Sequence, residues 1–150
     1  MPLNEAFLDH LSKFRTVPFL FVGAGLSRRY LGTENWEQLL RKYAAVAGRP
    51  YEYYRSTANG DFPRIASAIA EDLHDRWWTE KQFAQSRAEH ATDAIRRESA
   101  LKIEIARYLR SLSLTAVDAA LKPEVDELRR AVVDGIITTN WDLFLEEVFP

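Results

Sequence analysis

The sequence of 150 residues contains no cysteine. This absence excludes a disulfide framework, a cysteine-based zinc ribbon and a thiol nucleophile, and it agrees with a reducing compartment. An excess of one charge is also missing, because 20 Lys and Arg stand against 22 Asp and Glu, for a net charge of -2. That balance excludes a strongly basic protein that coats nucleic acid through phosphate neutralisation alone.

Long apolar runs are missing too. The longest run of this kind, Phe19-Leu20-Phe21-Val22, is far shorter than the ~20 residues that span a bilayer. The first residues have neither the basic nor the apolar region of a secretory signal. We therefore expect a cytoplasmic protein without a membrane partner.

The composition that remains is typical of a globular protein. Hydrophobic residues make up 47% and charged residues 28% of the chain, which excludes wholesale disorder. A chain of this length can bury enough surface for one core, so we expect one domain.

Hydrophobic periodicity predicts two short buried strands among helices. The strands are expected at residues 17–22 and 136–139, the first buried on both faces, and residues 51–61 are expected to form turns. Helices are predicted at residues 4–13, 35–47, 65–112 (uneven), 123–134 and 141–149, with core positions at Ile69, Leu73, Trp77, Ile95, Leu101, Ile105, Leu109, Val125, Leu128 and Val132. Strands alternating with helices predict a parallel α/β sheet. Because two parallel strands are a poor independent fold, we expect this sequence to be the N-terminal part of a longer protein.

A glycine-rich turn follows the first predicted strand, Gly23-Ala24-Gly25-Leu26-Ser27. Ligands of open α/β sheets bind beyond the carboxyl ends of the strands, and glycines let a pyrophosphate approach the backbone amides. The Ser27 hydroxyl could donate to a phosphate, and Arg28 and Arg29 could add charge. The alternatives are a purely structural turn and, for at least one of the arginines, an ordinary surface residue.

A second polar segment, Thr138-Thr139-Asn140-Trp141-Asp142, follows the second predicted strand. Its hydroxyl, amide and carboxylate groups suit a ribose or a carboxamide, and none of them is a good nucleophile. Helix capping by Thr139 or Asn140, with Asp142 in the first turn, is the alternative. In a parallel sheet the two strand ends can lie side by side and frame one site.

Together the two segments resemble the sirtuin-like superfamily, the silent-information-regulator-type NAD-consuming fold. The match consists of Gly23–Ser27 and 138–142, with Gly32, Trp36 and Leu39-Leu40 between them. The resemblance implies a Rossmann-like parallel sheet, partial in this chain, with a helical insertion at about residues 50–115 between the first two strands. Deacylases of the superfamily carry the sequence Gly-Ile-Pro-Asp-Phe-Arg at the position of residues 32–37, where this chain differs. Deacylases usually also carry a four-cysteine zinc module, whereas this chain has no cysteine. The chain therefore looks like the divergent bacterial branch of the superfamily.

Members of that branch are commonly N-terminal effector domains in antiphage defence that hydrolyse NAD to nicotinamide and ADP-ribose. The resemblance implies that Gly23, Ala24, Gly25 and Ser27 hold the pyrophosphate, and that Thr139 and Asn140 face the ribose. It implies that Asp142 holds the nicotinamide carboxamide, and that Asn140 and Asp142 are the catalytic residues. Trp36 is expected to pack in the core.

The resemblance also implies a homo-oligomer, with a downstream domain or partner protein that senses the phage trigger. The family uses a histidine base downstream of the second segment. His10, His74 and His90 do not occupy that position and are expected to be ordinary surface or packing residues. No metal site is predicted, and the mixed charges of residues 87–110 are those of a solvated helix rather than a nucleic-acid surface. The alternatives are a non-catalytic module that senses NAD or ADP-ribose and an NAD-dependent protein deacylase.

Overall fold

The computed structural model describes residues 3–13 and 16–150, which are 65% helical with one small parallel sheet. The α-helices are α1 (Leu3–Ser12), α2 (Ala24–Leu31), α3 (Trp36–Ala47), α4 (Tyr51–Thr57), α5 (Phe62–Thr79), α6 (Ala84–His90), α7 (Ser99–Ser111), α8 (Lys122–Arg130) and α9 (Phe144–Val148). The strands are β1 (Phe19–Val22) and β2 (Gly135–Thr138), and the short 3-10 helices are η1 (Lys81–Phe83) and η2 (Leu114–Ala116). The predicted α/β character is therefore confirmed in its coarse form. No helix in the described ranges is long and apolar enough to cross a membrane.

The chain divides into two compact units instead of the single domain expected. The helical unit, Thr33–Leu112, contains α3 to α7, and the sheet unit consists of residues 1–32 and 113–150. Each unit has its own buried cluster of apolar side chains. The helical unit begins at Thr33, ahead of α3, whereas the predicted insertion began at about residue 50.

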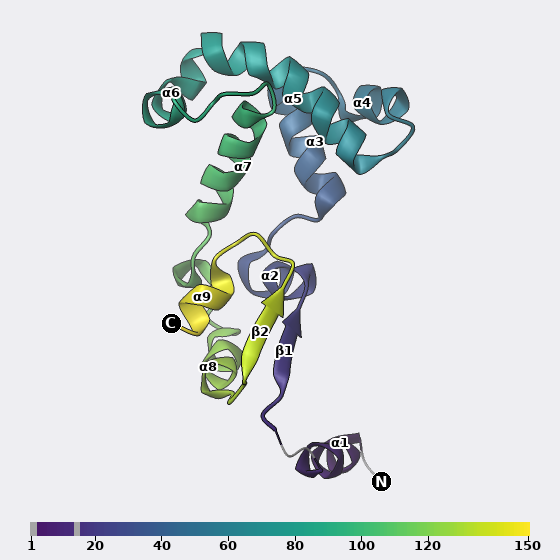
Figure 1. Ribbon diagram of the computed structural model, residues 1–150, viewed down its shortest axis with the longest axis vertical. Coiled ribbons are helices and arrows are strands. Elements are labelled where there is room, and N and C mark those ends of the chain that lie inside the picture. Colours follow the sequence, from purple (N-terminus) through teal and green to yellow (C-terminus); the bar gives the residue numbers. More distant parts are fainter. Residues whose placement is uncertain (1–2, 14–15) are drawn as a thin grey trace. The chain divides into compact units, whose positions relative to one another are not determined.

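In the sheet unit, β1 and β2 lie side by side and parallel, with Phe19 opposite Gly135 and Val22 opposite Thr138 (Figure 1). A Cβ on Gly135 would lie 2.5 Å from Cε1 of Phe19, so a larger residue at this position would displace that exposed ring. Only alternate side chains of β1 meet the core: Val22 is buried, whereas Phe19 and Phe21 are 60% and 73% exposed. The prediction that this strand is buried on both faces is therefore wrong.

Local capping chemistry defines the helices of the helical unit. The Asn35 side chain accepts from the Gln38 amide while the Gln38 side chain accepts from the Asn35 amide, which forms a capping box at the start of α3. Gly48 ends α3 with φ +93°, a left-handed conformation that favours glycine. Both ends of this helix were predicted correctly.

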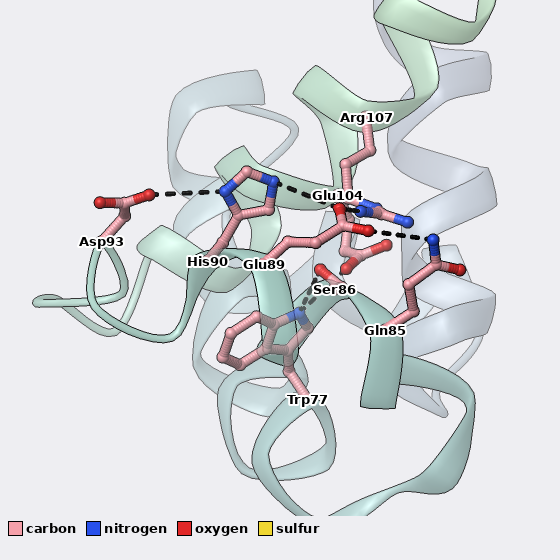
Figure 2. Close-up of polar contacts among 8 residues, drawn as sticks. All are labelled: Trp77, Gln85, Ser86, Glu89, His90, Asp93, Glu104 and Arg107. Atoms are coloured by element: carbon pink, nitrogen blue, oxygen red, sulfur yellow. Dashed lines mark hydrogen bonds and ion pairs between the residues drawn. The ribbon is translucent and has the colours of Figure 1, made fainter.

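Core packing of the helical unit agrees with most of the predicted positions. Trp77 is fully buried, and its indole N–H donates to Ser86 Oγ (3.2 Å) and Glu104 Oε1 (2.9 Å) (Figure 2). Buried with it are Ile69, Leu73, Leu101 and Ile105, and Leu109 packs at the edge. Ile95 is 81% exposed, because the chain turns between α6 and α7 there, so its assignment to the core is wrong.

Three further predictions need correction. Residues 51–57 form α4 and not a turn, because Pro50 opens a helix that buries Tyr51 and Tyr54. The helix α8 ends at Arg130, which leaves Val132 77% exposed and outside the helical face that carries the buried Val125. The last helix begins at Phe144, because residues 139–143 form the loop after β2.

Candidate functional site

The turn after β1 presents an uncapped helix end. Gly23 precedes α2 as its N-cap residue in an extended conformation and makes no side-chain cap. Since the first amides of a helix lack partners within the helix, they are available to an acceptor. A Cβ on Gly23 or Gly25 would meet no atom within 4 Å, so the space beside both residues is open. The glycines therefore leave room for a ligand beside the amides.

The segment after β2 is folded back onto its own backbone and onto the end of β1. The Thr139 amide donates to the Val22 carbonyl (3.3 Å), which extends the pairing by one residue. Thr138 Oγ1 accepts from the Asn140 amide (3.0 Å), and Asp142 Oδ1 accepts from the Phe144 amide (3.2 Å). The side chain that bonds an amide at the start of α9 is thus Asp142, and not Thr139 or Asn140 as the capping alternative proposed.

Hydrogen bonds join the two segments directly. Ser27 Oγ donates to Asp142 Oδ2 (2.7 Å), although the two residues are 115 positions apart. Asn140 Nδ2 donates to Ser27 Oγ (2.7 Å) and to the Gly23 carbonyl (3.2 Å). We call Ser27, Asn140 and Asp142 the polar cluster. The prediction that the two strand ends lie side by side is confirmed.

The cluster is anchored at its buried member. Ser27 is only 3% exposed, whereas Asn140 and Asp142 are half-buried. The other predicted site residues are exposed beside it: Gly23, Ala24, Gly25 and Thr139. Because the Ser27 hydroxyl has one proton and donates it to Asp142, it cannot also donate to a phosphate in this arrangement.

Sequence reasoning missed the residues that hold α2 in place. Arg29 makes two hydrogen bonds to Glu124 on α8, Nε to Oε2 at 2.9 Å and Nη2 to Oε1 at 2.6 Å, and the Tyr30 hydroxyl donates to Oε2 at 3.1 Å. The hydrogen bonds from Arg29 lower the pKa of the Glu124 carboxyl below its ordinary value. The Tyr30 ring stacks on Phe144, with centroids 5.3 Å apart. No local pattern signals these contacts, because the partners are distant in sequence.

Arg28 and Arg29, the two arginines after Ser27, differ in their contacts. Arg29 is occupied by Glu124, so it is not available to a ligand without losing that pair. Arg28 is exposed and forms no ion pair within the part of the chain that the structure describes. Of the two, only Arg28 therefore stays a candidate for charge beside the turn.

The remaining residues of the resemblance lie outside the polar cluster. Gly32 ends α2 with φ +65°, and Leu40 is fully buried in the helical unit. Trp36 is 50% exposed at the start of α3, so the expectation that it packs in the core is wrong. None of His10 (α1), His74 (α5) and His90 (α6) belongs to the cluster.

Comparisons with known proteins give no assignment: no protein-family model matches the chain, and no curated protein or solved structure is significantly similar to it. Across residues 3–13 and 16–150, no group of three or more His, Cys, Asp or Glu residues could hold a metal ion.

Proposed function

We propose that the sheet unit binds NAD at the carboxyl ends of β1 and β2, as part of a Rossmann-like sheet, and hydrolyses the bond between nicotinamide and ribose. The observation that carries this proposal is the hydrogen-bonded cluster of Ser27, Asn140 and Asp142 beside the uncapped start of α2. Taken separately, Gly23–Ser27 could be a structural turn and residues 138–142 could serve only to cap a helix. They meet at the same edge of the sheet, the edge at which parallel α/β sheets bind ligands.

The open turn suits the pyrophosphate of NAD. The amides of Gly23, Ala24 and Gly25 would donate to its oxygens, and the positive end of the α2 dipole favours the negative charge. Thr139 and Asn140 would contact the ribose on the nicotinamide side, and Asp142 the carboxamide. We assign Ser27 a positioning role, because its hydroxyl orients Asn140 and Asp142.

The proposed reaction needs few groups from the protein. The bond between the anomeric carbon and the nicotinamide nitrogen breaks, the electron pair leaves with neutral nicotinamide, and a charged oxocarbenium-like ribose forms. The oxygen of a water then bonds to the anomeric carbon and releases a proton to solvent, which gives ADP-ribose. Asn140 would orient the water or a ribose hydroxyl, and the Asp142 carboxylate would stabilise the developing positive charge.

The test is nicotinamide release from NAD by this chain and by the longest natural protein that contains it. We expect Asn140→Ala to abolish turnover and leave the fold intact, with the exposed Asn4→Ala in α1 as the matched control. Turnover by Asn140→Ala equal to that of the unchanged protein would remove Asn140 from the mechanism.

A second variant tests binding separately from chemistry. Gly25→Val adds a side chain into open space, so the local packing is kept while the pyrophosphate is crowded. We expect weaker binding of NAD, measured by calorimetry, and an unchanged circular dichroism spectrum. Unchanged affinity would contradict the assignment of this turn to the pyrophosphate.

A non-catalytic sensor of NAD or ADP-ribose is the second candidate. It is favoured by one observation: the polar cluster contains no histidine or other free base, and its three side chains bond to one another. Measurable binding of NAD without nicotinamide release, by the long protein as well as by this chain, would establish the sensor.

The biological setting that we propose comes from the resemblance. NAD depletion by a bacterial homo-oligomer would stop growth after a downstream domain or partner protein senses a phage. The assay above therefore includes the cognate trigger wherever one is known for the long protein.

A further inference from the structure

The helical unit contains a hollow that does not include the polar cluster. The ionisable residues that line this hollow are all basic. Its volume is about 210 Å³, and it lies between the end of α6 and one face of α7. The residues that line it are His90, Lys102, Ile103, Ala106, Arg107 and Arg110. The α7 residues recur at intervals of three and four, so they share one face of the helix.

The acidic residues nearby pair with this lining from outside it. Arg107 reaches from α7 to form an ion pair with Glu89 on α6, and His90 lies beside that pair (Figure 2). Glu89 Oε2 is 3.7 Å from His90 Nε2, and Asp93 Oδ2 is 3.4 Å from His90 Nδ1. The hydrogen bond from Gln85 lowers the pKa of the Glu89 carboxyl most, and the hydrogen bond from Arg107 lowers it further, so this carboxylate stays charged.

Two cations of the hollow are less engaged. Lys102 Nζ lies 3.7 Å from Glu98 Oε1, and the Lys102 side chain is 71% exposed, so this ion pair is weak. Arg110 is exposed and forms no ion pair with any described residue. Carboxylates adjacent to the hollow thus engage Arg107, His90 and Lys102, and Arg110 is left as a lining cation without an ion pair among the described residues.

We propose that this hollow binds the phosphate group of a small molecule. Guanidinium groups bind phosphate through paired hydrogen bonds, and Arg110 is free to do so while Lys102 adds a point charge. The volume is below the ~300–1,000 Å³ of pockets that enclose a drug-sized ligand, so only the anionic group would be enclosed. Ile103 and Ala106 supply an apolar wall against which the rest of the ligand could pack. The inference does not depend on the proposed function of the sheet unit.

The experiment is an amide NMR titration with inorganic phosphate, pyrophosphate and adenosine monophosphate, at constant ionic strength. We expect saturable shifts at His90 and along 102–110. The double variant Lys102→Gln/Arg110→Gln should raise the Kd about tenfold, since each charged hydrogen bond that is lost weakens binding. Arg55→Gln/Arg64→Gln is the matched control: it removes two exposed cations of the same unit that do not line the hollow.

Three results would overturn the inference. Equal weakening in both double variants would mean general charge attraction without a site. Shifts confined to Gly23–Ser27 would mean that phosphate binds only at the start of α2. Binding of a single-stranded oligonucleotide, without saturable binding of any of the three small probes, would mean a nucleic-acid surface. Among the small probes, tighter binding of adenosine monophosphate than of inorganic phosphate would identify a nucleotide as the source of the phosphate group.

Discussion

The polar cluster predicts a strong energetic coupling between two residues that lie far apart in the chain. We consider Ser27→Ala, which removes a hydroxyl that is 3% exposed and that makes hydrogen bonds at 2.7 Å to both Asp142 and Asn140. A hydrogen bond to a charged group contributes about 1.5–3 kcal/mol to stability and a neutral one about 0.5–1.5 kcal/mol. Since Asp142 and Asn140 are half-buried and can regain some water, the lower ends of both ranges apply. We therefore expect Ser27→Ala to lower the free energy of unfolding by about 2 kcal/mol.

The assay is urea unfolding followed by amide NMR signals of β1 and β2, which report on the sheet unit alone. A double-mutant cycle with Asp142→Ala isolates the bond between the two side chains, because the hydrogen bond from the Phe144 amide is lost both with and without Ser27 and cancels in the cycle. We expect a coupling energy of about 1 kcal/mol or more. The exposed Ser12→Ala in α1 is the control and should change stability by less than about 0.5 kcal/mol.

The cycle refutes the geometry if the two substitutions are additive within about 0.3–0.5 kcal/mol, the usual scatter for independent sites. Such a result would mean that Ser27 and Asp142 do not share a hydrogen bond in solution. The proposed NAD site would then lose the observation on which it rests.

Two further predictions concern the helical unit. Asn35→Ala should lower its stability by about 1 kcal/mol, because it removes the capping box with Gln38, whereas Asn35→Ser should keep most of it; equal losses in urea unfolding would contradict the cap. Burial raises the pKa of the Tyr43 and Tyr54 hydroxyls, and raises that of Tyr108 to about 12. In the unfolded chain they ionise near pH ~10, so the folded state holds more protons above that pH and its stability should fall as the pH rises further. Tyrosinate absorbance should show late ionisation of part of the tyrosines, and a single step near pH ~10 for all of them would contradict this.

Features set by neighbouring residues could be predicted from the sequence. The boundaries of α3 were correct, because Asn35 and Gly48 act within a few residues of themselves. Pro50 is the N-cap residue of α4 and lies two positions after Gly48, the residue that ends α3. The expectation of turns at residues 51–61 did not use Pro50 as the start of a helix, so α4 was not predicted.

Features set by packing could not be predicted in the same way. An apolar run such as Phe19–Val22 does not say how many of its faces are covered, and the structure covers only the one that carries Leu20 and Val22. For the candidate site, the sequence supplied the two polar segments and the expectation that they adjoin. The bond between Ser27 and Asp142 depends on the register of β1 against β2, which no residue of either segment specifies.

The insertion of the helical unit into the sheet unit has a consequence for the order of folding. The contacts of α3 with α5 and of α5 with α7 join segments that are close in sequence. The pairing of β1 with β2 joins segments that are separated in sequence by the whole helical unit. Closing a long flexible loop costs conformational entropy, and contacts of large sequence separation form slowly. Once the helical unit has folded, its first and last residues are held at one separation, so the loop between β1 and β2 is no longer a flexible chain. We therefore expect the helical unit to fold first. The two parallel strands would pair afterwards, because less flexible chain then separates them.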